Sequence, residues 1–286
     1  MKLWHFGCGG REHTYGENAA FSLSTKGTNM FMFDVNKTAT RVMRHLCILK
    51  KANVSQMILS VSHLHWDHLN AASWHSLKVL ARENKTKLSL MMSGFQKHDN
   101  EVLSAIKNFD GGGASSLATL TKAEVSDMMK WHKIETDQIQ HDRFERYNYA
   151  DKSRTFEHCV GLRIYNKNGY FTAYGVDHCD RDYVRNIVSD PKMVRFYTDA
   201  NDKTKAESQN HMSLEELNLL VPSYKRKKVT CVHIPFGAQK LARGMGFNTA
   251  IPTMAVLDPI FAKPDETLPD FSENLRTACK IALMGE

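Results

Sequence analysis

The sequence predicts an α/β fold in which helices cover β-sheets. Strand-like segments separated by turns make up the opening, and helical and strand patterns alternate through the last third. This progression is typical of a sheet with helices on its outside. The composition agrees, because 42% of the 286 residues are hydrophobic and 24% are charged. Values of this kind exclude a wholly disordered or fibrous chain.

Several protein classes are disfavoured before any motif is considered. No apolar run approaches the roughly eighteen residues of a membrane span, and the first residues lack the apolar core of a signal peptide. The six cysteines contain no Cys-x-x-Cys pair and do not resemble a disulfide framework. We therefore expect a cytoplasmic protein with no membrane partner. The net charge of +7 mildly favours a polyanionic partner.

The first third is predicted to alternate strands with helices. Short apolar runs that end at turn residues indicate strands, and apolar residues at helical spacing, such as Val42, Leu46 and Leu49, indicate helices. The expected strands are 20–24, 30–33, 56–61 and 87–92, and the expected helices are 38–51 and 73–83.

Residues 94–150 have a different character. Two helical patterns, 99–109 and 122–131, flank a Gly-rich loop over 110–116, and the whole segment is polar. Gly-rich loops of this kind usually lie at the surface. We interpret 94–150 as an insertion in a single domain that spans 1–286, with a lid as one role for it.

The last part of the chain predicts a hairpin followed by alternating elements. The hairpin strands are 162–165 and 170–174, joined through an Asn-Lys-Asn-Gly turn. After it we expect helices at 182–188, 213–221 and 238–245, with strands at 194–197 and 229–234.

The strongest functional signal lies at 63–68, directly after an apolar strand. His63, His65, Asp67 and His68 place four ligand-type side chains within six positions. Side chains two apart on an extended backbone point the same way, so His63 and His65 can hold one ion. Asp67 and His68 can turn toward a second. Imidazoles and carboxylates without cysteine favour catalytic zinc, with manganese and iron as alternatives.

The segment Ser62-His63-Leu64-His65-Trp66-Asp67-His68 resembles the His-x-His-x-Asp-His signature of the metallo-β-lactamase superfamily. The resemblance implies a four-layer αβ/βα sandwich with two metal ions. The strand that ends at Asp34 resembles the family's first motif, although Val35-Asn36 replaces the usual Cys-Gly. The resemblance covers most of 1–93 and 153–250.

The same resemblance implies three further metal ligands. His158 fits the third histidine of the first metal, because it precedes a hairpin strand. Asp177 fits the bridging aspartate, with His178, Asp180 and Asp182 as competitors. His233 fits the last histidine, at the end of an apolar strand. The remaining histidines, His141 among them, are interpreted as ordinary surface or core residues.

A second element indicates the branch of the superfamily. The segment from Asn210 to Leu217 resembles the histidine-led helix start of the RNase Z-like phosphodiesterases, and His211 precedes His233 by 22 residues. A phosphodiester cleavage benefits from an acid near the leaving oxygen. The alternative for His211 is a residue at a helix N-terminus with no catalytic part, with Ser213 as the cap.

Together these residues predict a metal-dependent phosphodiesterase. The two metal ions would activate a hydroxide, with Asp67 and His211 as the catalytic side chains. Trp66 and Asn210 are assigned to substrate binding, Trp66 either stacking on a base or packing beneath its loop. The expected substrate is a nucleotide or nucleic acid, first of all a cyclic nucleotide. The oligomeric state stays open, with a homodimer as one alternative.

Two other substrates are alternatives. Transfer-RNA processing relatives carry a long arm between the third histidine and the bridging aspartate, whereas only eighteen residues separate His158 from Asp177. An RNase Z-like endoribonuclease is thereby disfavoured, although the basic run over 225–228 could follow a nucleic-acid backbone or be a solvated turn. A lactone or ester hydrolase on the same metal pair is the other alternative.

Overall fold

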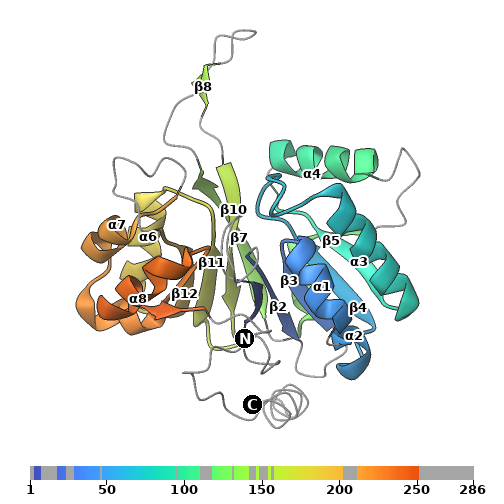
Figure 1. Cartoon of the computed structure of the whole chain (residues 1–286), viewed down its shortest axis with the longest axis horizontal. Coiled ribbons are helices and arrows are strands. Elements are labelled where there is room, and N and C mark those ends of the chain that lie inside the picture. The colour runs from blue at the N-terminus through green and yellow to red at the C-terminus, as the bar shows by residue number, and fades with distance from the viewer. Residues whose placement is uncertain are drawn as a thin grey trace. The chain divides into compact units, whose positions relative to one another are not determined.

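The computed structural model describes residues 3–7, 18–23, 29–45, 47–94, 96–109, 118–130, 132–141, 146–147, 154–155, 158–201 and 211–250. They form two compact units, unit 1 within Met1–His132 and unit 2 over Lys133–Ala250 (Figure 1). Each unit combines a mixed sheet with helices, which confirms the predicted α/β class. The single domain over 1–286 stays a prediction. None of the helices in these ranges is long and apolar enough to cross a bilayer.

In the described part of unit 1, a six-stranded sheet has the order β1-β2-β3-β4-β5-β6. Its strands are β1 Trp4–Gly7, β2 Ala19–Leu23, β3 Asn29–Phe33, β4 Gln56–Ser60, β5 Lys87–Met91 and β6 Ala118–Leu120. The first three pair antiparallel and the last four pair parallel. The carboxyl ends of β3 to β6 therefore meet at one edge of this sheet.

Helices α1 Lys37–His45, α2 Ile48–Lys51, α3 Ala71–Glu83 and α4 Gln96–Phe109 share a hydrophobic core with that sheet (Figure 1). Helix α5 Lys122–Met128 follows β6. Met30 and Met57 on the strands share a core with Val42 of α1 and Trp74 of α3. The single helix expected over 38–51 is interrupted, because Cys47 adopts a left-handed φ of 50°.

In the described part of unit 2, a second six-stranded sheet has the order β14-β13-β12-β11-β10-β7. Its strands are β7 Lys133–Gln140, β10 His158–Tyr165, β11 Phe171–Gly175, β12 Met193–Asp199, β13 Val229–Val232 and β14 Asn248–Thr249. Strands β7, β10 and β11 pair antiparallel, which includes the predicted hairpin, and β11 to β14 pair parallel. A short ladder joins β8 (Arg146–Tyr147) to β9 (Arg154–Thr155).

The helices of unit 2 are α6 Arg181–Ser189, α7 Leu214–Leu220 and α8 Phe236–Gly244, with the 3-10 helix η1 at Ser223–Lys228. Figure 1 shows α6, α7 and α8 along the sheet of this unit. Their apolar residues share a core with β11 to β13. Gly161 and Gly175 allow Tyr183 of α6 to lie flat on the sheet, since a Cβ on either would come within 3.0 Å of that ring or its hydroxyl.

The segment 94–150, which the sequence indicated as an insertion, is partly integral to the fold. Strand β6 forms an edge of the sheet in unit 1, and all eight residues of β7 pair with β10 in unit 2. The polar character of β7 follows from its edge position, where only one side of the strand pairs. The Gly-rich loop at 110–116 lies outside the described residues.

Candidate metal centre

In unit 1, a buried carboxylate orients the histidine motif. Asp34 follows β3 in a left-handed conformation with φ 61°. Its Oδ1 accepts the Ser62 backbone N–H at 2.6 Å, and its Oδ2 lies 3.0 Å from the Ser62 hydroxyl and 2.8 Å from Nδ1 of His68. A carboxylate on one ring nitrogen of a histidine directs the other nitrogen toward a metal. His68 Nε2 accordingly lies on the side of Asp67, 3.8 Å from its Oδ2.

Asn36 supports the same loop and gives a reason for the departure from the family's usual Cys-Gly. Its side-chain amide donates to the backbone oxygens of Asp67 and Asn18, each at 2.9 Å. Its side-chain oxygen accepts the Ala39 N–H at 2.9 Å and so caps α1. The Val35 N–H also donates to the His68 carbonyl at 2.8 Å. The Asn36 side chain therefore adds a bond that holds the loop at Asp67.

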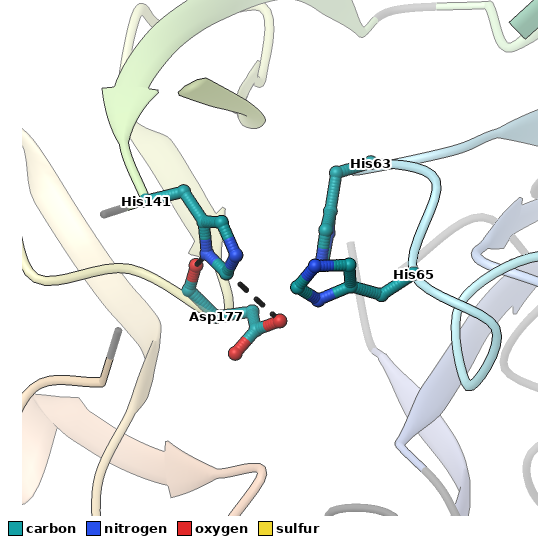
Figure 2. Close-up of side chains that lie close together, drawn as sticks. All are labelled: His63, His65, His141 and Asp177. Carbon is teal, nitrogen blue, oxygen red and sulfur yellow. Dashed lines mark hydrogen bonds and ion pairs between the residues drawn. The ribbon is translucent and has the colours of Figure 1, made fainter. Parts of the chain in front are cut away.

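The histidine side chains of this loop gather within unit 1. The ring centroids of His63 and His65 lie 4.5 Å apart, and those of His63 and His68 lie 4.2 Å apart. Figure 2 shows the first two rings on the loop that follows β4. His63, Asp67 and His68 are buried, whereas His65 and Trp66 are exposed. The predicted motif thus forms one cluster of donors.

In unit 2, the carboxyl ends of three parallel strands carry a second cluster. Asp177 follows β11, Asp199 ends β12 and His233 follows β13. His211 precedes α7, and its Nδ1 lies 2.7 Å from both Asp177 Oδ1 and Asp199 Oδ2. Nδ1 of His233 lies 3.4 Å from Asp199 Oδ1, and its ring stacks on that of His211 at 5.0 Å. Asp177 and His233 both adopt left-handed φ values, 56° and 53°, a strain typical of functional positions.

His141, which the sequence analysis interpreted as an ordinary residue, lies beside Asp177 of this cluster. It directly follows β7, is buried, and its Nδ1 lies 2.5 Å from the Asp177 carbonyl oxygen and 4.0 Å from the Asp177 Oδ2. Figure 2 shows the imidazole beside the aspartate. A bond from Nδ1 to a carbonyl leaves Nε2 as the ligand atom, which is the usual arrangement of a metal-binding histidine.

His158 does not take the place that the sequence predicted. It is the exposed first residue of β10, paired in register with Gln140, and it belongs to no described group of metal-type ligands. The sequence assignment differs because β7 was not recognised as a strand. His141 and His158 lie near the same end of an antiparallel pair, and the earlier of the two lies beside Asp177.

The competitors of Asp177 are engaged elsewhere. His178 Nε2 lies 2.9 Å from the Thr198 hydroxyl, and its Nδ1 accepts the Asp180 N–H at 3.3 Å. The Asp180 carboxylate accepts backbone N–H groups, and Asp182 is an exposed residue paired with Arg185. Of these four residues, only Asp177 contacts both His141 and His211. Asn210 lies outside the described residues.

The electrostatics of unit 2 hold a proton on His211. Burial lowers the pKa of His211, but the carboxylates of Asp199 and Asp177 outweigh it and raise that pKa to about 10. Burial raises the pKa of Asp199, but His211 and His233 outweigh it and lower that pKa to about 2. In the metal-free chain at neutral pH, His211 is therefore a cation and Asp199 an anion.

The donor set of unit 2 fits a divalent cation. Asp177, Asp199, His211 and His233 each offer one ligand atom, and these atoms all lie within 4.8 Å of one another. Three of the four residues are buried. Carboxylate oxygens and imidazole nitrogens are ligands of zinc, manganese and iron. Two buried carboxylates also favour positive charge beside them, because an uncompensated buried anion is costly.

Solved structures share this architecture. The metallo-β-lactamase fold protein YhfI from Bacillus subtilis matches with a TM-score of 0.57 and 14% identity, over 87% of this chain and 95% of that chain. A diphosphatase from the PhnP family matches with 0.59 and 13%, over 87% and 94%. The short form of human tRNase Z matches with 0.53 and 12%, over 88% and 96%. At these identities the likeness shows the fold, which is the metallo-β-lactamase fold that the motif predicted.

Sequence comparison identifies the family. No curated protein matches the chain. The model of one family, described as anti-Pycsar protein Apyc1, matches residues 1–255 and so includes every donor described above. This match extends over far more than half of the chain, and the chain therefore belongs to the anti-Pycsar protein Apyc1 family.

Proposed function

We propose that the chain is a metal-dependent phosphodiesterase that hydrolyses a cyclic nucleotide. The observation that carries the proposal is the His/Asp cluster of unit 2, in which Nδ1 of His211 lies 2.7 Å from the carboxylates of Asp177 and Asp199. The family membership fits a cyclic-nucleotide phosphodiesterase. The diphosphatase and the tRNase Z with the same fold act, by their names, on phosphorus esters and anhydrides, which also supports a phosphoryl substrate.

Within this proposal the chain binds two divalent cations, with zinc as the first choice. The assigned ligands are His63, His65, Asp67, His68, His141, Asp177 and His233, with His141 in place of His158. When bound, the cations would lower the pKa of a water molecule and neutralise charge on the phosphoryl oxygens. Asp34 and Asn36 keep the motif of unit 1 in place through the bonds described above.

The side chains of this chain then divide the proton transfers. Asp67 accepts a proton from the attacking water, since its carboxylate lies in the motif that carries the first ligands. His211, whose Nδ1 is held against the buried carboxylate of Asp199, donates a proton to the leaving oxygen or stabilises its charge. A positioned acid of this kind contributes about 100- to 10,000-fold to a rate.

The contacts of Trp66 support a role in binding the base. Its side chain is 49% exposed although it lies between His65 and Asp67. Its backbone oxygen accepts the Asn70 amide at 2.7 Å, and Asn70 caps α3, so the main chain is held while the indole faces outward. Aromatic rings stack on bases with little sequence preference. The assignment of Asn210 to the substrate stays a prediction.

Two further observations bear on an RNA substrate. Lys225, Arg226 and Lys228 donate to backbone carbonyls of their own unit, among them the Val188 and Asn218 oxygens at 2.5 and 3.0 Å. This supports a structural role for the basic run. With His141 as the third histidine, however, the β8–β9 ladder lies between it and Asp177, and Figure 1 shows β8 beyond the end of β10. The short spacing from His158 therefore no longer argues against an arm.

A substrate panel tests the proposal. It contains 3′,5′-cyclic mononucleotides, bis(p-nitrophenyl) phosphate, single-stranded and folded RNA, DNA and a lactone, each with and without a chelator. We expect chelator-sensitive hydrolysis of cyclic mononucleotides with the highest kcat/KM. Preference for folded RNA would favour the endoribonuclease, and preference for the lactone would overturn the phosphodiesterase. A chain that takes up no metal on reconstitution would overturn the whole proposal.

A further inference from the structure

The residues directly after Asp177 contact three of the segments that carry the other donors of unit 2, those of His141, Asp199 and His211. His178 reaches Thr198, which precedes Asp199, through the hydrogen bond described above. Arg181 donates to Glu216 Oε1 through Nε at 2.9 Å and Nη2 at 2.6 Å, and Glu216 forms the capping box with Ser213 near His211. Cys179 and Asp180 reach Gln140, the neighbour of His141. One short segment thereby connects four separate parts of the cluster.

The contact with Gln140 is made at an edge of the sheet. Among the described strands, β7 is the last of its sheet and pairs with β10 alone. Its final residue, Gln140, accepts the Cys179 N–H at 3.0 Å on its carbonyl and donates its own N–H to Asp180 Oδ2 at 3.2 Å. Residues 179–180 therefore continue the pairing that the edge strand would otherwise lack. This fixes the direction in which the chain leaves β7.

The two carboxylate oxygens of Asp180 accept hydrogen bonds from two different parts of unit 2. Oδ1 accepts the Tyr183 N–H at 2.8 Å and caps α6, while Oδ2 holds Gln140. Because α6 packs its apolar face into the core of unit 2, the cap is anchored to a rigid element. Because the second oxygen accepts the Gln140 N–H, the end of β7 is held to the same helix.

We propose that Asp180 is a positioning residue for His141, which it holds at Asp177 by accepting the N–H of Gln140. The inference rests on the proposed function, in which His141 is a metal ligand. His141 is covalently next to Gln140, so release of that N–H lets the strand end shift and moves the imidazole away from the Asp177 carbonyl. Partners that orient metal ligands typically contribute about 10- to 100-fold to metal affinity.

The substitution Asp180→Asn separates the two tasks. Asparagine is as good an N-cap as aspartate, so its amide oxygen can keep the cap of α6. The amide nitrogen is a donor and cannot accept the Gln140 N–H. Asp180→Ser is a second variant, because serine also caps well. Its side chain is shorter and has a single oxygen, so it cannot accept both N–H groups. Either variant that folds is informative.

The readout is metal affinity, measured by competition of zinc with a chromophoric chelator, together with the unfolding midpoint of the metal-free protein. For D180N we expect zinc affinity to fall by about tenfold or more, with a midpoint close to that of the wild type. The zinc concentration that gives half-maximal phosphodiesterase activity should rise by the same factor, and excess zinc should restore kcat.

Asp182→Asn is the matched control. It makes the same chemical change two residues later, at an exposed side chain that pairs with Arg185 of the same helix. Its zinc affinity should equal that of the wild type. Equal zinc affinity in D180N and the wild type would overturn the positioning role, as would a loss that D182N shares. Failure of the wild type to bind zinc would instead overturn the proposed function.

Discussion

The two units bring histidines and carboxylates together through different arrangements of the chain. Both place histidines and carboxylates where parallel strands end, the position at which open α/β sheets usually bind ligands. In unit 1, the four donors lie within six consecutive residues, 63–68. In unit 2, the donors come from five segments, around positions 141, 177, 199, 211 and 233. A contiguous motif depends on one loop, whereas the dispersed one depends on the register of a whole sheet.

In both units a buried aspartate orients a histidine ring. Each contains a fully buried aspartate at the end of a parallel strand, Asp34 after β3 and Asp199 at the end of β12. Asp34 lies 2.8 Å from Nδ1 of His68, and Asp199 lies 2.7 Å from Nδ1 of His211. A buried carboxylate on one nitrogen fixes both the tautomer and the direction of the ring. Each unit thus orients its own histidine.

The largest loss of activity is expected for the ligand histidines, and it tests whether both units supply ligands. His63→Ala in unit 1 and His141→Ala in unit 2 should each lower kcat/KM for a cyclic nucleotide by more than about 100-fold, because losing a ligand costs more than losing an orienting partner. His158→Ala should leave kcat/KM unchanged, since His158 is exposed and apart from the cluster. A large loss in H158A with none in H141A would restore the assignment made from sequence.

The next effect concerns the acid of unit 2. His211→Ala should lower kcat by about 100-fold with a phosphodiester, and the loss should be smallest with bis(p-nitrophenyl) phosphate, whose leaving group needs little protonation. His75→Ala, which removes an exposed histidine on α3, is the control and should have wild-type activity. An equal loss with phosphodiester and lactone substrates would contradict a role at a leaving phosphate ester.

A smaller effect tests the close packing that holds the strands of unit 2. In Gly161→Ala the new Cβ would lie 2.3 Å from Ile139 Cδ1 and 2.9 Å from Tyr183 Oη. We expect the free energy of unfolding to fall by about 1–3 kcal/mol, as for other overpacked cores. Gly244→Ala, at the end of α8 with nothing within 4 Å, should raise it by about 0.4–1 kcal/mol. Urea unfolding measures both, and similar values would contradict this packing.

The last effect is a pH dependence of the metal-free protein. The folded pKa of His211 is raised from 6.5 to about 10, so its protonation stabilises the fold fully below pH 6.5 and the contribution is lost as pH rises through 10. The folded pKa of Asp199 is lowered from 3.8 to about 2, so its contribution is present above pH 3.8 and lost as pH falls through 2.

Urea unfolding at pH 6 and pH 9.5 can measure the histidine part. The wild type should lose stability between these values, and His211→Gln, which cannot titrate, should lose less. The same decrease in both proteins would show that another group in the chain causes it. The two experiments must be done without metal, because a bound cation would replace the proton as the partner of the aspartates.

The donors that the sequence indicated are those with a local pattern around them. The motif at 63–68 is visible because a strand and a turn suffice to place it. The family resemblance implied Asp177 and His233, and each follows an apolar strand. Asp199 has the same position at the end of β12, and that signal could have identified it. His141 follows a polar edge strand, which lacks the apolar run that reveals the others.

The fold shows the same pattern. The central strands β3, β4, β11 and β13 and the amphipathic helices are local features, because burial on one or both faces leaves an apolar record in the sequence. Strands β6 and β7 leave almost none, since an edge strand buries less, and 94–150 was therefore interpreted as an insertion. The break at Cys47 depends on one left-handed residue, which periodicity does not report.

By itself, the amino-acid sequence determined the α/β class, the histidine-rich loop and the family of folds to which they belong, because these follow from patterns within a few residues of one another. Only the tertiary structure showed that His141 rather than His158 lies beside Asp177, and that Asp199 lies against the ring of His211. These choices depend on strand pairing across tens of residues, where a change of register exchanges one histidine for another without altering any local pattern.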